Sequence, residues 1–148
     1  IQNQKYKIKV FENMLDGSEN FALIKGKILP GKKIRVRVIS SNLVQNYLMG
    51  KKFPDLFNKT IRYFKNFNNC VLVFIKDTNL KSVTQTLSVY RSSKNYKKSD
   101  QMIRNYGIGA QIIKSLNIKK MILVTRSPKK IVSLEGFGIK IIKQEIIK

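Results

Sequence analysis

Two short apolar runs without a polar break constrain this fold more than any other feature of the sequence. Residues 71–75 (VLVFI) and 121–124 (MILV) are too short for a buried helix, and they lack the polar alternation of a strand with one wet face. Strands of this kind lie in sheets that are covered on both faces. Apolar residues recur at helical spacing in residues 54–67, 80–90 and 102–116, and we expect helices there to form the cover.

The first third of the chain predicts strands joined by turns. Residues 6–10 alternate Tyr, Ile and Val with Lys, which predicts a half-buried strand, and residues 21–24 predict a second strand. A third strand spans residues 34–38 and leads into the polar cluster Ser40-Ser41-Asn42, and residues 139–142 predict the last strand. Because strands come first and then alternate with helices, the chain predicts one α+β (mixed α/β) domain over all 148 residues, a mixed sheet packed by helices.

The scarcity of metal-binding and nucleophilic side chains excludes several classes of function. The chain has one cysteine, Cys70, and no histidine. It therefore cannot build a disulfide framework or a Cys/His zinc cage, and no histidine can act as a general base. We expect a reducing, cytoplasmic compartment. We also expect no membrane association, because no apolar run approaches the roughly 18 residues of a membrane span.

Basic residues dominate the charge, since Lys and Arg total 30 against 8 Asp and Glu, a formal net charge of +22. A surplus of this size attracts polyanions such as nucleic acid, acidic lipid or phosphorylated small molecules. Lysine far outnumbers arginine, however, as AT-rich codon usage alone would produce, and the 6 tyrosines do not cluster as a stacking platform. Nucleic-acid binding is therefore an alternative and not the main prediction.

Three motifs in the C-terminal third occur in an order and spacing typical of one enzyme family. They are residues 105–112 (NYGIGAQI), 125–132 (TRSPKKIV) and 134–138 (LEGFG). Together they closely resemble the C-terminal half of GTP cyclohydrolase II, the enzyme that opens the guanine ring at the start of riboflavin synthesis. The similarity continues more weakly through residues 22–26 and 37–40, and it fades between residues 41 and 98.

The resemblance implies a phosphate site assembled from separate elements. The family's phosphate-contacting arginine matches Arg37, with Ser40 beside it, and its proposed nucleophilic arginine matches Arg104. The threonine and the second lysine of the Thr-x-x-Pro-Lys-Lys segment, which hold the nucleotide in the family, match Thr125 and Lys130. Guanidinium and ammonium groups are the donors that a triphosphate needs. Taken singly, Arg37 or Lys130 is better interpreted as a solvated charge on a strand or helix. Their joint occurrence within the family motifs favours the phosphate site.

The family's zinc ligands are missing from this chain. The family holds zinc through three cysteines, and the first of these positions is Asn42, preceded by Ser41 in place of an acid. Residues 47–52 supply neither of the other two, and Cys70 reads as a small core side chain at the start of a buried strand. Ring opening needs a metal-activated water. We therefore expect no zinc and no other cofactor.

Two further departures affect the same chemistry. Met102 stands where the family has its proton-accepting aspartate, and a thioether cannot accept that proton. Residues 76–81, which follow the central strand, contain no glycine where the family has a Gly- and Arg-rich loop around the nucleotide. We expect the fold to be kept, the ring-opening chemistry to be lost, and Arg104 to be a vestigial catalytic residue.

By resemblance, such a domain forms the C-terminal part of a longer fused chain, behind a 3,4-dihydroxy-2-butanone 4-phosphate synthase domain, and a start at Ile1 agrees with that expectation. The expected role is to form a homodimer, to stabilise the partner domain, or to bind GTP or another phosphate ligand without turnover. Any lyase activity of the intact chain would belong to the partner domain. Two alternatives stay open: a basic nucleic-acid-binding module, and an active GTP cyclohydrolase II with an atypical metal site.

Overall fold

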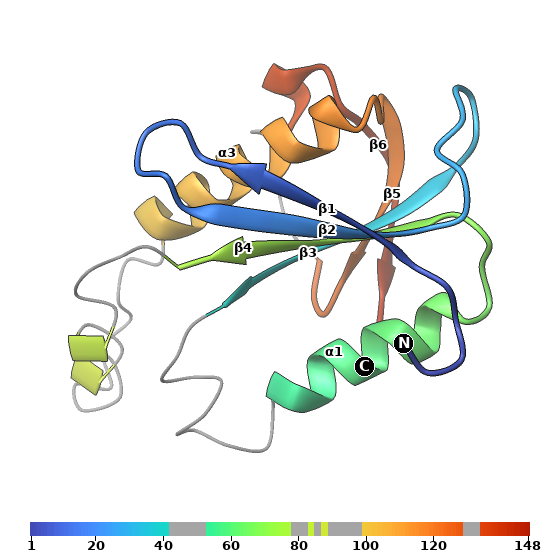
Figure 1. Cartoon of the computed structure of the whole chain (residues 1–148), viewed down its shortest axis with the longest axis horizontal. Coiled ribbons are helices and arrows are strands. Elements are labelled where there is room, and N and C mark those ends of the chain that lie inside the picture. The colour runs from blue at the N-terminus through green and yellow to red at the C-terminus, as the bar shows by residue number, and fades with distance from the viewer. Residues whose placement is uncertain (42–52, 78–82, 85–86, 89–98, 129–133) are drawn as a thin grey trace.

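The two uninterrupted apolar runs form strands inside a mixed six-stranded sheet. The computed structural model describes residues 1–41, 53–77, 83–84, 87–88, 99–128 and 134–148, and for residues 53–55, 99–105 and 135 it describes the backbone. The strands are β1 (Lys7–Glu12), β2 (Glu19–Lys25), β3 (Ile34–Ser41), β4 (Cys70–Lys76), β5 (Lys120–Thr125) and β6 (Lys140–Ile146). The helices are α1 (Phe53–Phe64), α3 (Ser99–Ser115) and the short 3-10 helix η2 (Glu135–Phe137) (Figure 1).

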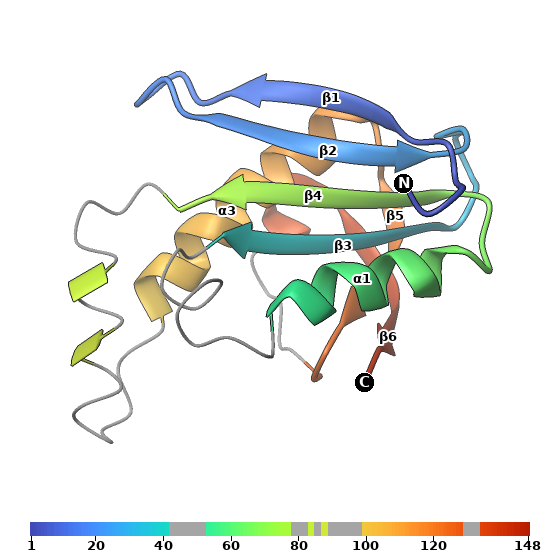
Figure 2. The ribbon, with the colours of Figure 1, turned by 60° about the horizontal axis from the view of Figure 1, so that its bottom comes forward.

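The strand order in the sheet is β1-β2-β4-β3-β5-β6. β3 pairs in parallel with both β4 and β5, and β5 pairs in parallel with β6. The N-terminal hairpin joins this parallel part through β2, which runs antiparallel to β1 and to β4 (Figure 2). The predicted α+β class with a mixed sheet is therefore confirmed.

The order of the parallel strands creates a topological switch point. The chain passes from β3 to its neighbour β4, and then crosses back to place β5 on the other side of β3. In open sheets of this kind, ligands bind outside the carboxyl ends of the strands at the point where the winding direction reverses. The fold alone thus directs attention to the carboxyl ends of β3 and β5.

Helices cover the two faces of the sheet, as the uninterrupted runs require. On one face α3 contributes Ala110, Ile113 and Leu116 to an apolar cluster with Val36 and Val73. The α1 face carries a second cluster, which contains Leu56, Ile61, Phe64, Leu72 and Val124. Within the described ranges, no helix is long and apolar enough to cross a membrane.

Gly109 of the Tyr-Gly-Ile-Gly motif is a packing position. A Cβ added there would lie 3.3 Å from the side chains of both Val38 and Ile75, so the glycine lets α3 approach β3 and β4 closely. Gly107, by contrast, has open space where a Cβ would stand. One of the two motif glycines is therefore explained by the fold.

The structure corrects the prediction of a half-buried first strand. Ile8 and Val10 are 64% and 56% exposed, because β1 is an edge strand that α1 does not cover. Phe11 instead packs against the α3-side cluster. The helix predicted at residues 80–90 lies mostly outside the described residues, of which 83–84 and 87–88 are helical.

Candidate functional site

The predicted phosphate-site residues on β3 and β5 lie where these two strands stop pairing. Their ladder joins Ile34, Arg35 and Val36 to residues 121–123 and ends there. Beyond that point β3 continues to Ser41 beside β4, and β5 continues to Thr125 beside β6. Two parallel strands thus separate toward their carboxyl ends, at the switch point.

Arg37 bridges this separation from inside the protein. It is 4% exposed, and its register partner on β4 is Leu72, a member of the apolar cluster under α1. Its Nη1 donates to the carbonyl of Val124 on β5 at 3.4 Å, and its Nε is buried without a hydrogen-bond partner in the described part of the chain. The interpretation of Arg37 as a solvated strand charge is therefore wrong.

The electrostatic surroundings of Arg37 disfavour its charge. Burial, followed by repulsion from the nearby Arg126, lowers the pKa of Arg37 to about 10. That pKa still leaves the guanidinium charged at neutral pH. Because a buried cation with an unpaired N–H is costly, this position is a candidate for binding an anion.

Ser40 and Thr125 lie at the same end of the sheet as Arg37, but their side chains have different surroundings. Ser40 is half-buried and stands opposite Ile75 in the parallel ladder with β4. Ser40 lies three positions after Arg37 on the strand, so the two side chains lie on opposite faces of β3. Thr125 is 6% exposed, and its hydroxyl donates to the carbonyl of Ser127 at 3.0 Å. The structure brings these three residues to one edge of the sheet, on both of its faces.

The structure describes less of the other two predicted site residues, Arg104 and Lys130. Arg104 lies in the first half of α3, and both views show that α3 starts at the end of the sheet to which β3 and β4 point (Figures 1 and 2). The structure describes the backbone there and not the side chain of Arg104 or of Met102. Lys130 lies outside the described residues.

A charged cluster that sequence reasoning missed ties the last strand to the sheet. Arg35 donates from Nε and Nη2 to the two carboxylate oxygens of Glu145 on β6, at 2.8 and 3.1 Å. Tyr63 of α1 donates to the same carboxylate, and the Arg35 guanidinium lies 3.4 Å from the ring centre of Phe67. The available signal was that Glu145 is the only acid among residues 136–148.

The cluster sets the charge of Glu145. Burial alone would raise the pKa of this carboxyl, but the hydrogen bonds from Arg35 and Tyr63 outweigh it and hold the pKa below its usual value. Glu145 therefore stays ionised and neutralises Arg35. Arg37, two residues further along β3, has no such acid partner among the residues that the structure describes.

The residues present do not fit the family's zinc ion. Cys70 is fully buried at the amino end of β4, and burial raises the pKa of its thiol to about 12. The carboxyl end of that seven-residue strand is roughly 20 Å away at about 3.3 Å per residue. No group of three or more Cys, Asp or Glu side chains comes together in the described ranges. The sole cysteine is therefore protonated. It also lies at the amino ends of the strands, whereas a metal beside Ser40 would lie at their carboxyl ends.

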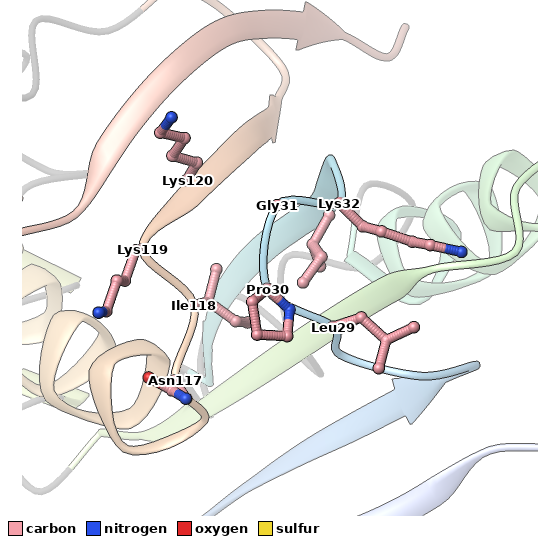
Figure 3. Close-up of a pocket in the computed structure, with 9 residues that line it drawn as sticks. Leu29, Pro30, Gly31, Lys32, Asn117, Ile118, Lys119 and Lys120 are labelled. Atoms are coloured by element: carbon pink, nitrogen blue, oxygen red, sulfur yellow. The ribbon is translucent and has the colours of Figure 1, made fainter.

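A surface hollow of about 190 Å³ lies at the opposite edge of the sheet, lined by residues 29–32, Ile34 and residues 117–120 (Figure 3). These residues surround the amino ends of β3 and β5. The ammonium ends of Lys32, Lys119 and Lys120 point away from one another (Figure 3). They do not converge on a common ligand, so the candidate phosphate site remains the one at the carboxyl ends of β3 and β5.

Comparison with known proteins finds relatives that are named as riboflavin biosynthesis proteins. The chain is similar to "Monofunctional riboflavin biosynthesis protein RIBA 2, chloroplastic" of Arabidopsis thaliana, with 29% identity over 145 residues that cover 92% of this chain and 30% of the relative. It is similar to "Riboflavin biosynthesis protein RibBA" of Aquifex aeolicus, with 30% identity over 157 residues that cover 97% of this chain and 38% of the relative. The chain thus spans between 30% and 38% of the length of these two relatives.

A family model extends the match over almost the whole chain. The model of GTP cyclohydrolase II matches residues 1–146, which include the N-terminal hairpin as well as the three motifs of the C-terminal third. The chain belongs to the GTP cyclohydrolase II family.

Proposed function

We propose that this domain binds the phosphates of GTP or a related anion without opening the guanine ring. We also propose that it serves as the partner of a 3,4-dihydroxy-2-butanone 4-phosphate synthase domain in riboflavin biosynthesis. The phosphate donors in this proposal are Arg37, Ser40, Arg104, Thr125 and Lys130. The observation that carries the proposal is the buried, incompletely bonded guanidinium of Arg37 at the switch point of the sheet.

Two features of Arg37 favour phosphate binding over a purely structural role. A structural buried arginine is normally paired with a carboxylate, as Arg35 is with Glu145. Among the residues that the structure describes, Arg37 has one long hydrogen bond to a carbonyl, and its Nε is unpaired, so an incoming phosphate would supply both charge and acceptors. In this proposal Arg104 has kept a binding role and lost its catalytic one.

The proposed loss of ring opening rests on the donor set. The positions of the family's first zinc cysteine and of its proton acceptor are Asn42 and Met102, and Cys70 is distant and protonated. Without a metal-activated water, attack on the guanine carbon is too slow at neutral pH. An active enzyme with an atypical metal site is the alternative that a turnover assay excludes or establishes.

The names of the relatives support the proposed fusion partner. One of them is named "Bifunctional riboflavin biosynthesis protein RIBA 1, chloroplastic", and it matches 89% of this chain over 27% of its own length. A second domain in the complete protein would carry the synthase activity. We propose a cytoplasmic location, because the one cysteine of this chain, Cys70, is a free thiol.

Calorimetric titration with GTP, combined with a ring-opening assay in the presence of added zinc, tests the proposal. We expect wild type to bind GTP at physiological salt without forming a ring-opened product. Arg37→Met should weaken binding at least tenfold, and the matched control Arg62→Met, which removes an exposed arginine of α1, should bind within about twofold of wild type. Zinc-dependent ring opening by wild type would contradict the proposal.

A homodimer is a second candidate role, favoured by apolar side chains on the edge hairpin. Ile8 and Val10 are largely exposed on β1, and Met14 and Leu15 in the adjoining turn are 92% and 95% exposed. Exposed apolar groups on an edge strand mark contact surfaces. We expect Val10→Lys to shift the protein toward monomer in sedimentation analysis, while Lys7→Ala on the opposite face of β1 leaves the assembly unchanged. Equal behaviour of both variants would contradict a dimer through this surface.

A further inference from the structure

We propose that Arg126 acts with Arg37 as a pair of guanidinium groups that binds one doubly charged phosphate at the carboxyl ends of β3 and β5. The inference deepens the phosphate site proposed above and rests on it. It adds Arg126, which lies within the motif at residues 125–132 but was not among the predicted site residues. It also specifies which phosphate of a nucleotide the site takes.

The geometry places both arginines at the point where β3 and β5 separate. The last residue pair of their ladder is Val36 with Leu123. The next residue of β3 is Arg37, whose Nη1 donates to the carbonyl of Val124 on β5. Arg126 follows Val124 by two residues and is exposed to solvent. Arg37 thus reaches the separation from inside the protein, and Arg126 lies on the chain directly after β5, exposed to solvent.

The charges of the two arginines are unbalanced in the described part of the chain. Neither has an acidic partner there, although Arg35 on the same face of β3 binds Glu145 through two hydrogen bonds. Arg126 is close enough to Arg37 for its charge to help lower the pKa of Arg37, after burial. Repulsion between two like charges is relieved when an anion binds to both of them.

The chemistry of the pair favours a phosphate dianion. Planar guanidinium forks match the oxygens of phosphate, and two positive charges match the two negative charges that a terminal phosphate carries above its second pKa of about 6. An internal phosphodiester carries a single charge and offers fewer free oxygens. The pair should therefore select the terminal phosphate of a nucleotide.

Titrations of four proteins with GTP, pyrophosphate and cyclic GMP at pH 7.5 and pH 5 test the proposal. The proteins are wild type, Arg126→Gln, Arg126→Lys and the control Lys114→Gln, which removes one exposed charge from α3. At pH 7.5 we expect Arg126→Gln to weaken GTP and pyrophosphate binding about tenfold, and Arg126→Lys to weaken them less. Lys114→Gln should stay within about twofold of wild type. Cyclic GMP should bind wild type no better than it binds Arg126→Gln.

The titrations at pH 5, and the results that would contradict the proposal, distinguish this inference from the proposed function. At pH 5 the terminal phosphate loses its second charge, so the difference between wild type and Arg126→Gln should shrink. Equal GTP binding by wild type and Arg126→Gln, with binding lost in Arg37→Met, would overturn the pair and leave the proposed function standing. Pyrophosphate binding that depends on Arg126, without GTP binding, would support the pair and refute a nucleotide site. Binding of neither ligand by wild type would overturn both.

Discussion

Arg35 and Arg37 lie two residues apart on the same face of β3, yet within the described ranges only Arg35 has an acidic partner. Arg35 has a carboxylate held by two hydrogen bonds and an aromatic ring against its guanidinium. Arg37 is more deeply buried, and the hydrogen bond that its side chain makes within the described part of the chain is a long one, to a carbonyl. Residues that are poorly compensated in the folded protein are typical of binding sites, where stability is lower than the fold could provide.

This contrast predicts opposite stability effects for two matched substitutions. Arg37→Met keeps an apolar stem and removes an unpaired buried charge, so we expect the free energy of unfolding to rise by about 1–2 kcal/mol. Arg35→Met leaves the carboxylate of Glu145 without its partner, so we expect a loss of about 3 kcal/mol. Urea denaturation of both variants at neutral pH measures the difference. A comparable loss in Arg37→Met would show that its guanidinium is structural.

Glu145 predicts a stability change on the acidic side. Its pKa is lower in the folded protein than in the unfolded chain, so the stabilisation is complete above the unfolded value and is lost as the pH falls through the folded value. We expect Glu145→Gln to lower the free energy of unfolding by about 2 kcal/mol at pH 7, and the gap to wild type to close below about pH 4. Tyr63→Phe keeps the ion pair and should cost about 1 kcal/mol. A gap that persists unchanged at pH 3 would contradict this account.

At the scale of the elements, local patterns predicted the strands and helices that have an uninterrupted or periodic apolar sequence. β4, β5, α1 and α3 all lie where those patterns indicate. The prediction that β1 is half-buried was wrong. Alternation of polar and apolar residues shows that a strand has two different faces, but it does not show whether a helix covers the apolar one. The partners of Arg35 were not predictable because Glu145 is distant in the sequence and reaches Arg35 through the pairing of β3, β5 and β6.

Gly26 shows how one position at the end of an element depends on another element. It follows β2 with a φ of +76°, and a Cβ there would lie 2.0 Å from the carbonyl oxygen of Asn68, close to the start of β4. Gly31 has a similar φ of +81°, but a Cβ added there would have no heavy atom within 4 Å. We expect Gly26→Ala to lower the free energy of unfolding by about 3 kcal/mol and Gly31→Ala by about 1 kcal/mol in urea denaturation. Equal losses would mean that the close approach to Asn68 contributes nothing.

At the scale of the whole molecule, the net charge of +22 and the candidate phosphate site predict different dependences on salt. A charge spread over the surface binds nucleic acid through counterion release, so its affinity falls steeply as salt rises. The buried Arg37 and its neighbours act at short range, where salt screens them less. The phosphate-site residues themselves could be proposed from sequence only through family resemblance, because single charges on strands look alike until burial separates them.

We therefore expect GTP binding to persist at physiological salt, while binding of a short DNA duplex is weak, indifferent to sequence and largely lost there. Arg104→Ala should reduce GTP binding at least tenfold, because the site loses one of its proposed phosphate donors. Lys9→Ala, which removes an exposed charge from β1, should leave GTP binding within about twofold and lower duplex affinity slightly. Titrations of the three proteins with both ligands at low and at physiological salt give the comparison. Duplex binding that resists salt, in a protein that does not bind GTP, would replace the phosphate-site proposal with a nucleic-acid-binding function.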